Sequence, residues 1–88
     1  MYNQGTFERR RIHESKVDRA FEVTPSDSQD LKHPTIAIYV AEEGDLRIML
    51  ASEEVVTLQN LVAGAWHPIS AIKIFQTGTT CSGIVGAY

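Results

Sequence analysis

The sequence that decides the fold class is Thr35-Ile36-Ala37-Ile38-Tyr39-Val40-Ala41, followed by Glu42-Glu43-Gly44-Asp45 and then Leu46-Arg47-Ile48-Met49-Leu50. The two outer runs are rich in β-branched and apolar residues and alternate with a period of two, which is typical of strands. An acidic, glycine-containing turn between two such runs predicts a β-hairpin. The residues expected on its shared apolar face are Ile36, Ile38, Val40, Leu46, Ile48 and Leu50.

The chain after this hairpin repeats the same alternation. Further strands are expected at residues 55–60, 71–76 and 84–88, with a short extended piece at 66–69. Gly64 predicts a bulge or a sharp bend between them, and no apolar stripe with a helical period is evident. The sequence therefore predicts an all-β fold, a small antiparallel β-sandwich or barrel of about five to seven short strands with an extended N-terminal arm.

The N-terminal residues 1–22 show neither the helical nor the strand period. Many of them are charged, with sparse large apolar residues between the charges, and a loop rich in Pro, Ser and Asp follows. We therefore expect an arm, extended or partly ordered, over residues 1–22 and a β domain over residues 23–88. The apolar residues of the arm are either anchors that dock on a neighbouring subunit or parts of a disordered tail, and the sequence leaves both interpretations open.

Length and composition restrict the classes of function. Eighty-eight residues make one domain with a small core, and the single cysteine excludes a disulfide within the chain, so oligomerisation is the expected reinforcement. One lone cysteine also suits folding in a reducing cytoplasm. A net charge of −3 argues against a general nucleic-acid binder. Neither an apolar run long enough to cross a membrane nor the residue order of a signal peptide is present in the sequence.

No motif for catalysis, a metal or a cofactor is found in the sequence. The acidic pairs at 42–43 and 53–54 lie in predicted turns, where carboxylates are solvated. The three histidines lie in separate segments without ligand spacing, and Cys81 has the character of a structural thiol. The loop 77–83 lacks the lysine of a phosphate-binding loop. We therefore expect a protein that is not an enzyme and has no cofactor.

A few residues are candidates for contact with a partner. Arg9-Arg10-Arg11 is suited to an acidic partner surface or to nucleic acid, although the flanking Glu8 and Glu14 also fit a solvated face. Trp66 has the residue type of an interface anchor, or it belongs to the core. The candidate interface residues are Phe7, Arg9, Arg10, Arg11, Ile12, Phe21, Trp66 and His67.

A series of short motifs covers about residues 17–88. In order they are Pro25-Ser26-Asp27 with Asp30-Leu31, Tyr39-Val40-Ala41 with Gly44-Asp45-Leu46, Val62-Ala63-Gly64 with Pro68-Ile69, Thr77-Gly78-Thr79-Thr80, and Ile84-Val85-Gly86-Ala87-Tyr88. Together they resemble the small spike-base proteins of tailed phages and of the gene transfer agents of α-proteobacteria. Three residues depart from the pattern: Ala41 replaces a glycine, Cys81 an alanine and His67 an apolar residue.

The resemblance implies a virion structural protein on the capsid surface, assembled in the host cytoplasm, whose oligomer (a pentamer or a trimer) is a base that seats a head spike or fibre. It implies the major capsid protein and a spike or fibre protein as partners, with no nucleic acid and no membrane, and an arm that reaches a neighbouring capsid subunit. The alternatives are a capsid cement or decoration protein and a ring component of the head–tail or tail connector. A sugar- or peptide-binding module would need Tyr39, Trp66 and Tyr88 on one face.

Overall fold

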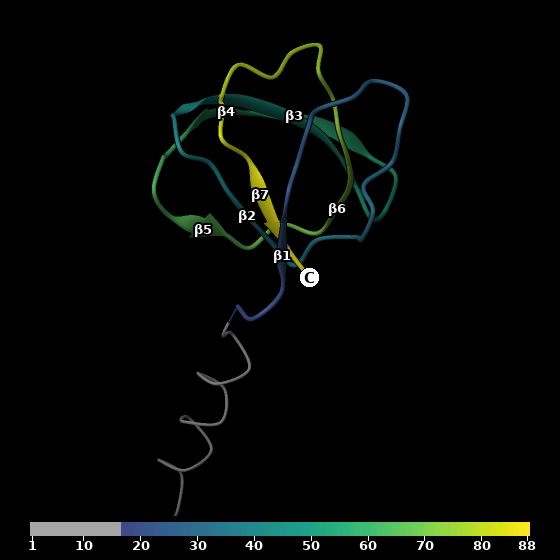
Figure 1. Cartoon of the computed structure of the whole chain (residues 1–88). Helices are drawn as coiled ribbons and strands as arrows, with labels where there is room; N and C mark the ends of the chain where they lie inside the picture. The colour runs from purple at the N-terminus through teal and green to yellow at the C-terminus, as the bar shows by residue number, and fades with distance from the viewer. Residues whose placement is uncertain (1–16) are drawn as a thin grey trace, which may run out of the picture.

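A computed structural model describes residues 17–88, which fold into seven strands arranged as two antiparallel sheets (Figure 1). The first sheet has the strand order β1-β7-β2-β5 and the second the order β4-β3-β6. The all-β, two-sheet expectation is confirmed, and of the two architectures expected it is the sandwich. The strands are β1 (Ala20–Glu22), β2 (Ala37–Tyr39), β3 (Gly44–Leu50), β4 (Val55–Leu61), β5 (Trp66–His67), β6 (Ala71–Ile74) and β7 (Val85–Ala87).

The hairpin expected between β2 and β3 is not formed. β2 pairs with β5 and β7, whereas β3 pairs with β4 and β6, so the turn at 42–43 carries the chain from one sheet to the other. The prediction was wrong because alternation identifies a strand and its apolar face but not its neighbour. Ile36 also departs from the expectation, since it precedes β2 and is 56% exposed.

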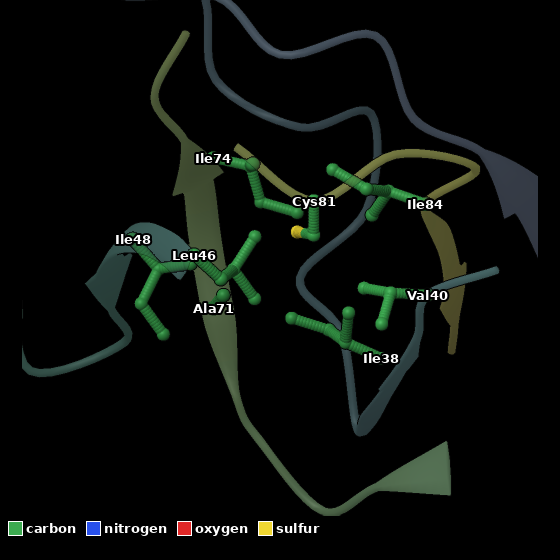
Figure 2. Packing of buried hydrophobic residues seen from close by; sticks show 8 residues of the cluster. All are labelled: Ile38, Val40, Leu46, Ile48, Ala71, Ile74, Cys81 and Ile84. Atoms are coloured by element: carbon green, nitrogen blue, oxygen red, sulfur yellow. The ribbon is translucent and has the colours of Figure 1, made fainter. Parts of the chain in front are cut away.

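The apolar faces of β2 and β3 do meet, but across the core. Ile38 comes from β2 and Val40 directly follows it, Leu46 and Ile48 come from β3 in the second sheet, and all four are fully buried. Figure 2 shows these side chains pointing toward one another, with Ile74, Cys81 and Ile84 closing the cluster. Burying an aliphatic side chain of this size stabilises the fold by about 1.5–3 kcal/mol.

The crossing segment is held by the loop that precedes β7. The backbone N–H of Ala41 donates to the carbonyls of Ser82 and Gly83, at 3.0 and 3.1 Å. At Gly44 a Cβ atom would lie 2.6 Å from the backbone nitrogen of Cys81, so a side chain there has no room. This close approach explains the glycine at the start of β3.

Two turns agree with their sequence patterns. The polar segment 51–54 joins β3 to β4, with Glu53 in the left-handed region at φ 73°. Gly64 has φ 79° in the turn between β4 and β5, where its N–H donates to the carbonyl oxygen of Val40. Left-handed backbone at Gly64 accounts for the sharp bend expected there.

β1 lies within residues 1–22, the stretch assigned to the arm. It pairs with β7 in the register Ala20↔Ala87, Phe21↔Gly86 and Glu22↔Val85. The ring of Phe21 lies over Gly86, where an added Cβ would be 3.3 Å from it. The folded domain therefore begins before residue 23, and the part of the arm at 1–16 lies outside the described residues.

Candidate interaction surface

Five of the eight candidate interface residues (Phe7, Arg9, Arg10, Arg11 and Ile12) lie outside the described residues. Of the others, Phe21 is half-buried against its own domain. Its ring makes edge contacts with His33 and Tyr88, with centroids 5.7 and 5.6 Å away. His33 and Tyr88 stack on each other at 3.9 Å. Phe21 thus fixes the C-terminal residue and the segment before β2 to β1.

Trp66 and His67 point to opposite faces of the first sheet. Trp66 is opposite Tyr39 in the register and lies on the outer face, 41% exposed, with its ring 5.5 Å from that of Tyr39. His67 is opposite the buried Ile38, and its Nε2 lies 2.8 Å from the carbonyl oxygen of Val62. Trp66 and Tyr39 therefore form an aromatic pair on the outer face, with Trp66 exposed and Tyr39 half-buried, while His67 has a structural contact.

The aromatic pair of Trp66 and Tyr39 does not extend to Tyr88. Tyr88 stacks on His33 beside β1, whereas Tyr39 and Trp66 lie at β2 and β5. The three aromatic residues that a sugar- or peptide-binding module would need are therefore not gathered on one face. A protein partner that binds over this pair would bury Trp66, and tryptophan is among the residue types enriched at interface hot spots.

An apolar groove of about 540 Å³ opens between the two sheets on the side of β4. Its walls are the inner face of the β3–β4 hairpin and the connection from β5 to β6. The lining residues are Ile48, Leu50, Ala51, Ser52, Val56, Leu58, Pro68, Ile69 and Ser70. Val56, Leu58 and Ile69 are only half-buried, because no element of residues 17–88 covers this side of the sandwich.

The opposite side of the second sheet is closed by the segment before β2. The N–H groups of Ser26, Leu31 and Thr35 donate to the carbonyls of Ile74, Ile72 and Ala71, at 2.8–2.9 Å. These bonds satisfy the outer edge of β6 along its length. The two edges of this sheet therefore differ, since residues 23–35 cover β6 whereas no segment of residues 17–88 covers β4.

The residues of the 77–80 motif join loops to β3. The hydroxyl of Thr80 accepts from the N–H of Asp45 at 2.8 Å, and that of Thr79 from the N–H of Arg47 at 3.1 Å. The side chain and the N–H of Thr77 both donate to Asp27. These contacts give the motif a structural role.

The carboxylate of Asp27 is the acceptor in the contact with Thr77. It accepts from Thr77 Oγ1 at 2.6 Å, and from the N–H groups of Thr77 and Gln76 at 2.9 Å each. These hydrogen bonds, the one from the Thr77 side chain above all, hold the pKa of Asp27 below its usual value. The carboxylate thus fastens the 23–35 segment to the end of β6.

The remaining reactive groups are placed for structure. Cys81 is 6% exposed and its pKa is raised, first by burial and then by the charge of Asp45, so the thiolate nucleophile is disfavoured. Residues 17–88 contain no cluster of His, Cys, Asp and Glu that could hold a metal ion. Among the same residues there is no helix whose length and apolar content would let it span a bilayer.

Comparison with known proteins decides the family. A solved structure described as the capsid of a native gene transfer agent (GTA) particle, computed with C5 symmetry, contains a chain that is 35% identical to this one, with a TM-score of 0.76. The match covers 85% of this chain and 87% of that chain. The chain belongs to the same family as that chain of the GTA capsid. No protein-family model matches the chain, and no curated protein matches its sequence.

Family membership makes the chain a capsid-related protein, like its relative in the GTA particle. This agrees with the wider part of the resemblance seen in the motifs and is consistent with a structural role. The sequence did not reveal the apolar groove, because Val56 and Leu58 have the pattern of ordinary core residues. The sequence signal that could have indicated an interaction surface is the lack of charge in the seven residues of β4.

Proposed function

We propose that the chain is the oligomeric base that seats a head spike or fibre on the capsid surface. The observation that carries this proposal is the match to a chain of a GTA capsid computed with C5 symmetry. Because the match covers 85% and 87% of the two chains, they are of nearly equal length, and the likeness is between whole small domains. A single sandwich of this size is suited to attachment on a shell formed by a larger protein.

The proposed partners are further copies of this chain, the major capsid protein and a spike or fibre protein. A pentamer or a trimer is the expected form, since copies related by a symmetry axis enclose a central position for an elongated partner. The exposed Trp66, packed beside the half-buried Tyr39, supports a protein partner at the outer face of the first sheet. The proposed location is the virion, with assembly in the host cytoplasm.

Imaging of purified particles at low resolution tests this proposal. A spike base predicts copies around the five-fold vertices with extra density above them. Copies over the local three-fold axes would identify a cement or decoration protein instead. A ring at a single vertex would identify a component of the head–tail or tail connector. Each of these last two outcomes would refute the spike-base function.

A further inference from the structure

The groove and the free edge of β4 form one continuous surface. The backbone N–H of Leu50 donates to the carbonyl oxygen of Glu54 at 2.8 Å. Because every second pair of an antiparallel ladder is hydrogen-bonded, Val56 and Leu58 are also in hydrogen-bonded pairs with β3. The backbone groups of Val55 and Thr57 therefore point away from the sheet. Within residues 17–88 nothing bonds to them. The same strand thus presents free backbone groups along its edge and the apolar groove beneath it.

This edge lacks the protection that edge strands usually have. Natural edges are short, or carry charged residues or proline that prevent pairing with another chain. β4 is seven residues long, with neither a charge nor a proline, and Val55 is 44% exposed. Such an edge beside an apolar groove is suited to an added extended segment, which pairs through its backbone and inserts alternate side chains into the groove.

Charge indicates which segment this is. Residues 17–88 carry nine Asp or Glu and four Lys or Arg, a net charge of −5, whereas residues 1–16 carry two and four, a net charge of +2. The groove ends at Ser52, and the exposed carboxylates of Glu53 and Glu54 follow directly. A basic segment with an apolar side chain complements this surface, and within this chain residues 1–16 have that composition.

The direction of the chain favours a neighbouring copy over the same copy. Residues 1–16 precede β1, which is the edge of the first sheet farthest from β5, and the groove lies on the β5 side. Fully extended, sixteen residues span about 50 Å against a width of about 15 Å for a four-stranded sheet, so the arm is long enough to reach beyond its own domain, and the side on which it leaves is what favours the neighbour. An arm from one side of a copy to the opposite side of the next makes a head-to-tail contact, which forms a ring when the rotation between successive copies closes.

We propose that residues 1–16 of a neighbouring copy pair with the edge of β4 and place Phe7 in the groove. In an extended segment Arg9 and Arg11 lie on the same face as Phe7, where they meet Glu53 and Glu54. Ile12 lies on the opposite face and stays outside the groove. This inference rests on the proposed oligomeric base, and it assigns the arm to the next copy rather than to a shell subunit.

Disulfide trapping between full-length chains tests the contact. All chains carry Cys81→Ala, the residue usual in the resembling family, so that only introduced thiols react. Chains with His13→Cys, which follows Arg11 on the Phe7 face of the arm, are mixed with chains with Ser52→Cys, at the end of the groove, or with the control Ser28→Cys, exposed on the covered side of the sheet. We expect a cross-linked dimer with Ser52→Cys and at least about tenfold slower cross-linking with Ser28→Cys, the factor given by roughly 1.4 kcal/mol of docking energy.

Two arm variants identify the anchor. Phe7→Ala should slow cross-linking to Ser52→Cys at least about tenfold, because one buried aromatic side chain is lost, whereas Ile12→Ala should change the rate by less than about twofold. Equal rates at the Ser52→Cys and Ser28→Cys positions would overturn the proposal and leave the groove to another occupant. So would cross-linking only within a chain that carries both His13→Cys and Ser52→Cys.

The outcomes separate this inference from the proposed function. Oligomers of unchanged mass with no cross-link at Ser52→Cys refute the arm contact and leave the spike base standing. If particle images show no copies at the five-fold vertices, the spike-base function is refuted. If the chain is strictly monomeric in solution, the arm contact between copies is refuted.

Discussion

Replacing Thr35 with valine should destabilise the domain strongly, although the two side chains have nearly the same shape. Thr35 is 1% exposed and precedes β2. Its hydroxyl donates to the carbonyl of Ile69 at 2.8 Å and accepts from the N–H of Ala71 at 3.0 Å. One hydroxyl group thus joins the first sheet to the start of β6, beside the floor of the groove.

The expected loss follows from these two bonds. Without the hydroxyl, the N–H of Ala71 is buried without a partner, at a cost of about 1–3 kcal/mol, and the bond to Ile69 is worth about 0.5–1.5 kcal/mol. The sum is about 2–4 kcal/mol. A domain of the size of residues 17–88 is expected to be stable by about 4–11 kcal/mol, so Thr35→Val should remove a large part of the free energy of unfolding.

Urea unfolding followed by circular dichroism measures this loss. With a slope near 1 kcal/mol per molar urea, the midpoint should fall by about 2–4 M at a fixed protein concentration. Thr35→Ser keeps the hydroxyl and loses one methyl, so it should cost only about 1 kcal/mol. Thr57→Val, on the exposed face of β4, is the matched control. A loss for Thr35→Val no larger than that of Thr57→Val would refute the reasoning.

Two further predictions concern the loops. Gly44→Ala should destabilise the domain by about 1–3 kcal/mol, because a Cβ 2.6 Å from the backbone nitrogen of Cys81 forces the loop away from β3. The N–H of Asp45, which donates to Thr80, should then exchange its hydrogen faster. Unchanged exchange at Asp45 would contradict this. The pKa of Asp27 is lower in the folded than in the unfolded chain, so its stabilisation is present above the usual value of 3.8 and is lost as pH falls through the lowered pKa. Stability measured against pH should therefore decline more steeply in acid for the wild type than for Asp27→Asn, and parallel curves would refute the role of this carboxylate.

Most strands could be predicted from the sequence, because alternation is a local property. The runs at 46–50, 55–60 and 71–76 correspond to β3, β4 and β6, with ends displaced by at most two residues. β1 was not expected, since a strand of three residues with one large apolar side chain, Phe21, has no detectable period. It forms because β7 offers an edge and Gly86 leaves room for the Phe21 ring.

The candidate surface was only partly predictable. Trp66 was identified as an interface or core residue, and its exposure follows from the register of β5, which places it opposite Tyr39. A shift by one residue would have buried Trp66 and exposed His67. The groove was not predictable, because Val56 and Leu58 alternate like core residues and only the absence of a covering element in residues 17–88 leaves them half-exposed.

By itself the sequence determined the fold class, the approximate positions of most strands and the turns at 51–54 and Gly64. These follow from periodicity and backbone conformation, which neighbouring residues set. Only the tertiary structure decided that β2 and β3 lie in different sheets, that Asp27 holds Thr77 fifty positions away, and that β4 has no partner on its outer edge among residues 17–88. Pairing partners and uncovered edges depend on contacts between distant segments, and an apolar strand face is satisfied equally well by a neighbour in its own sheet or by the sheet opposite.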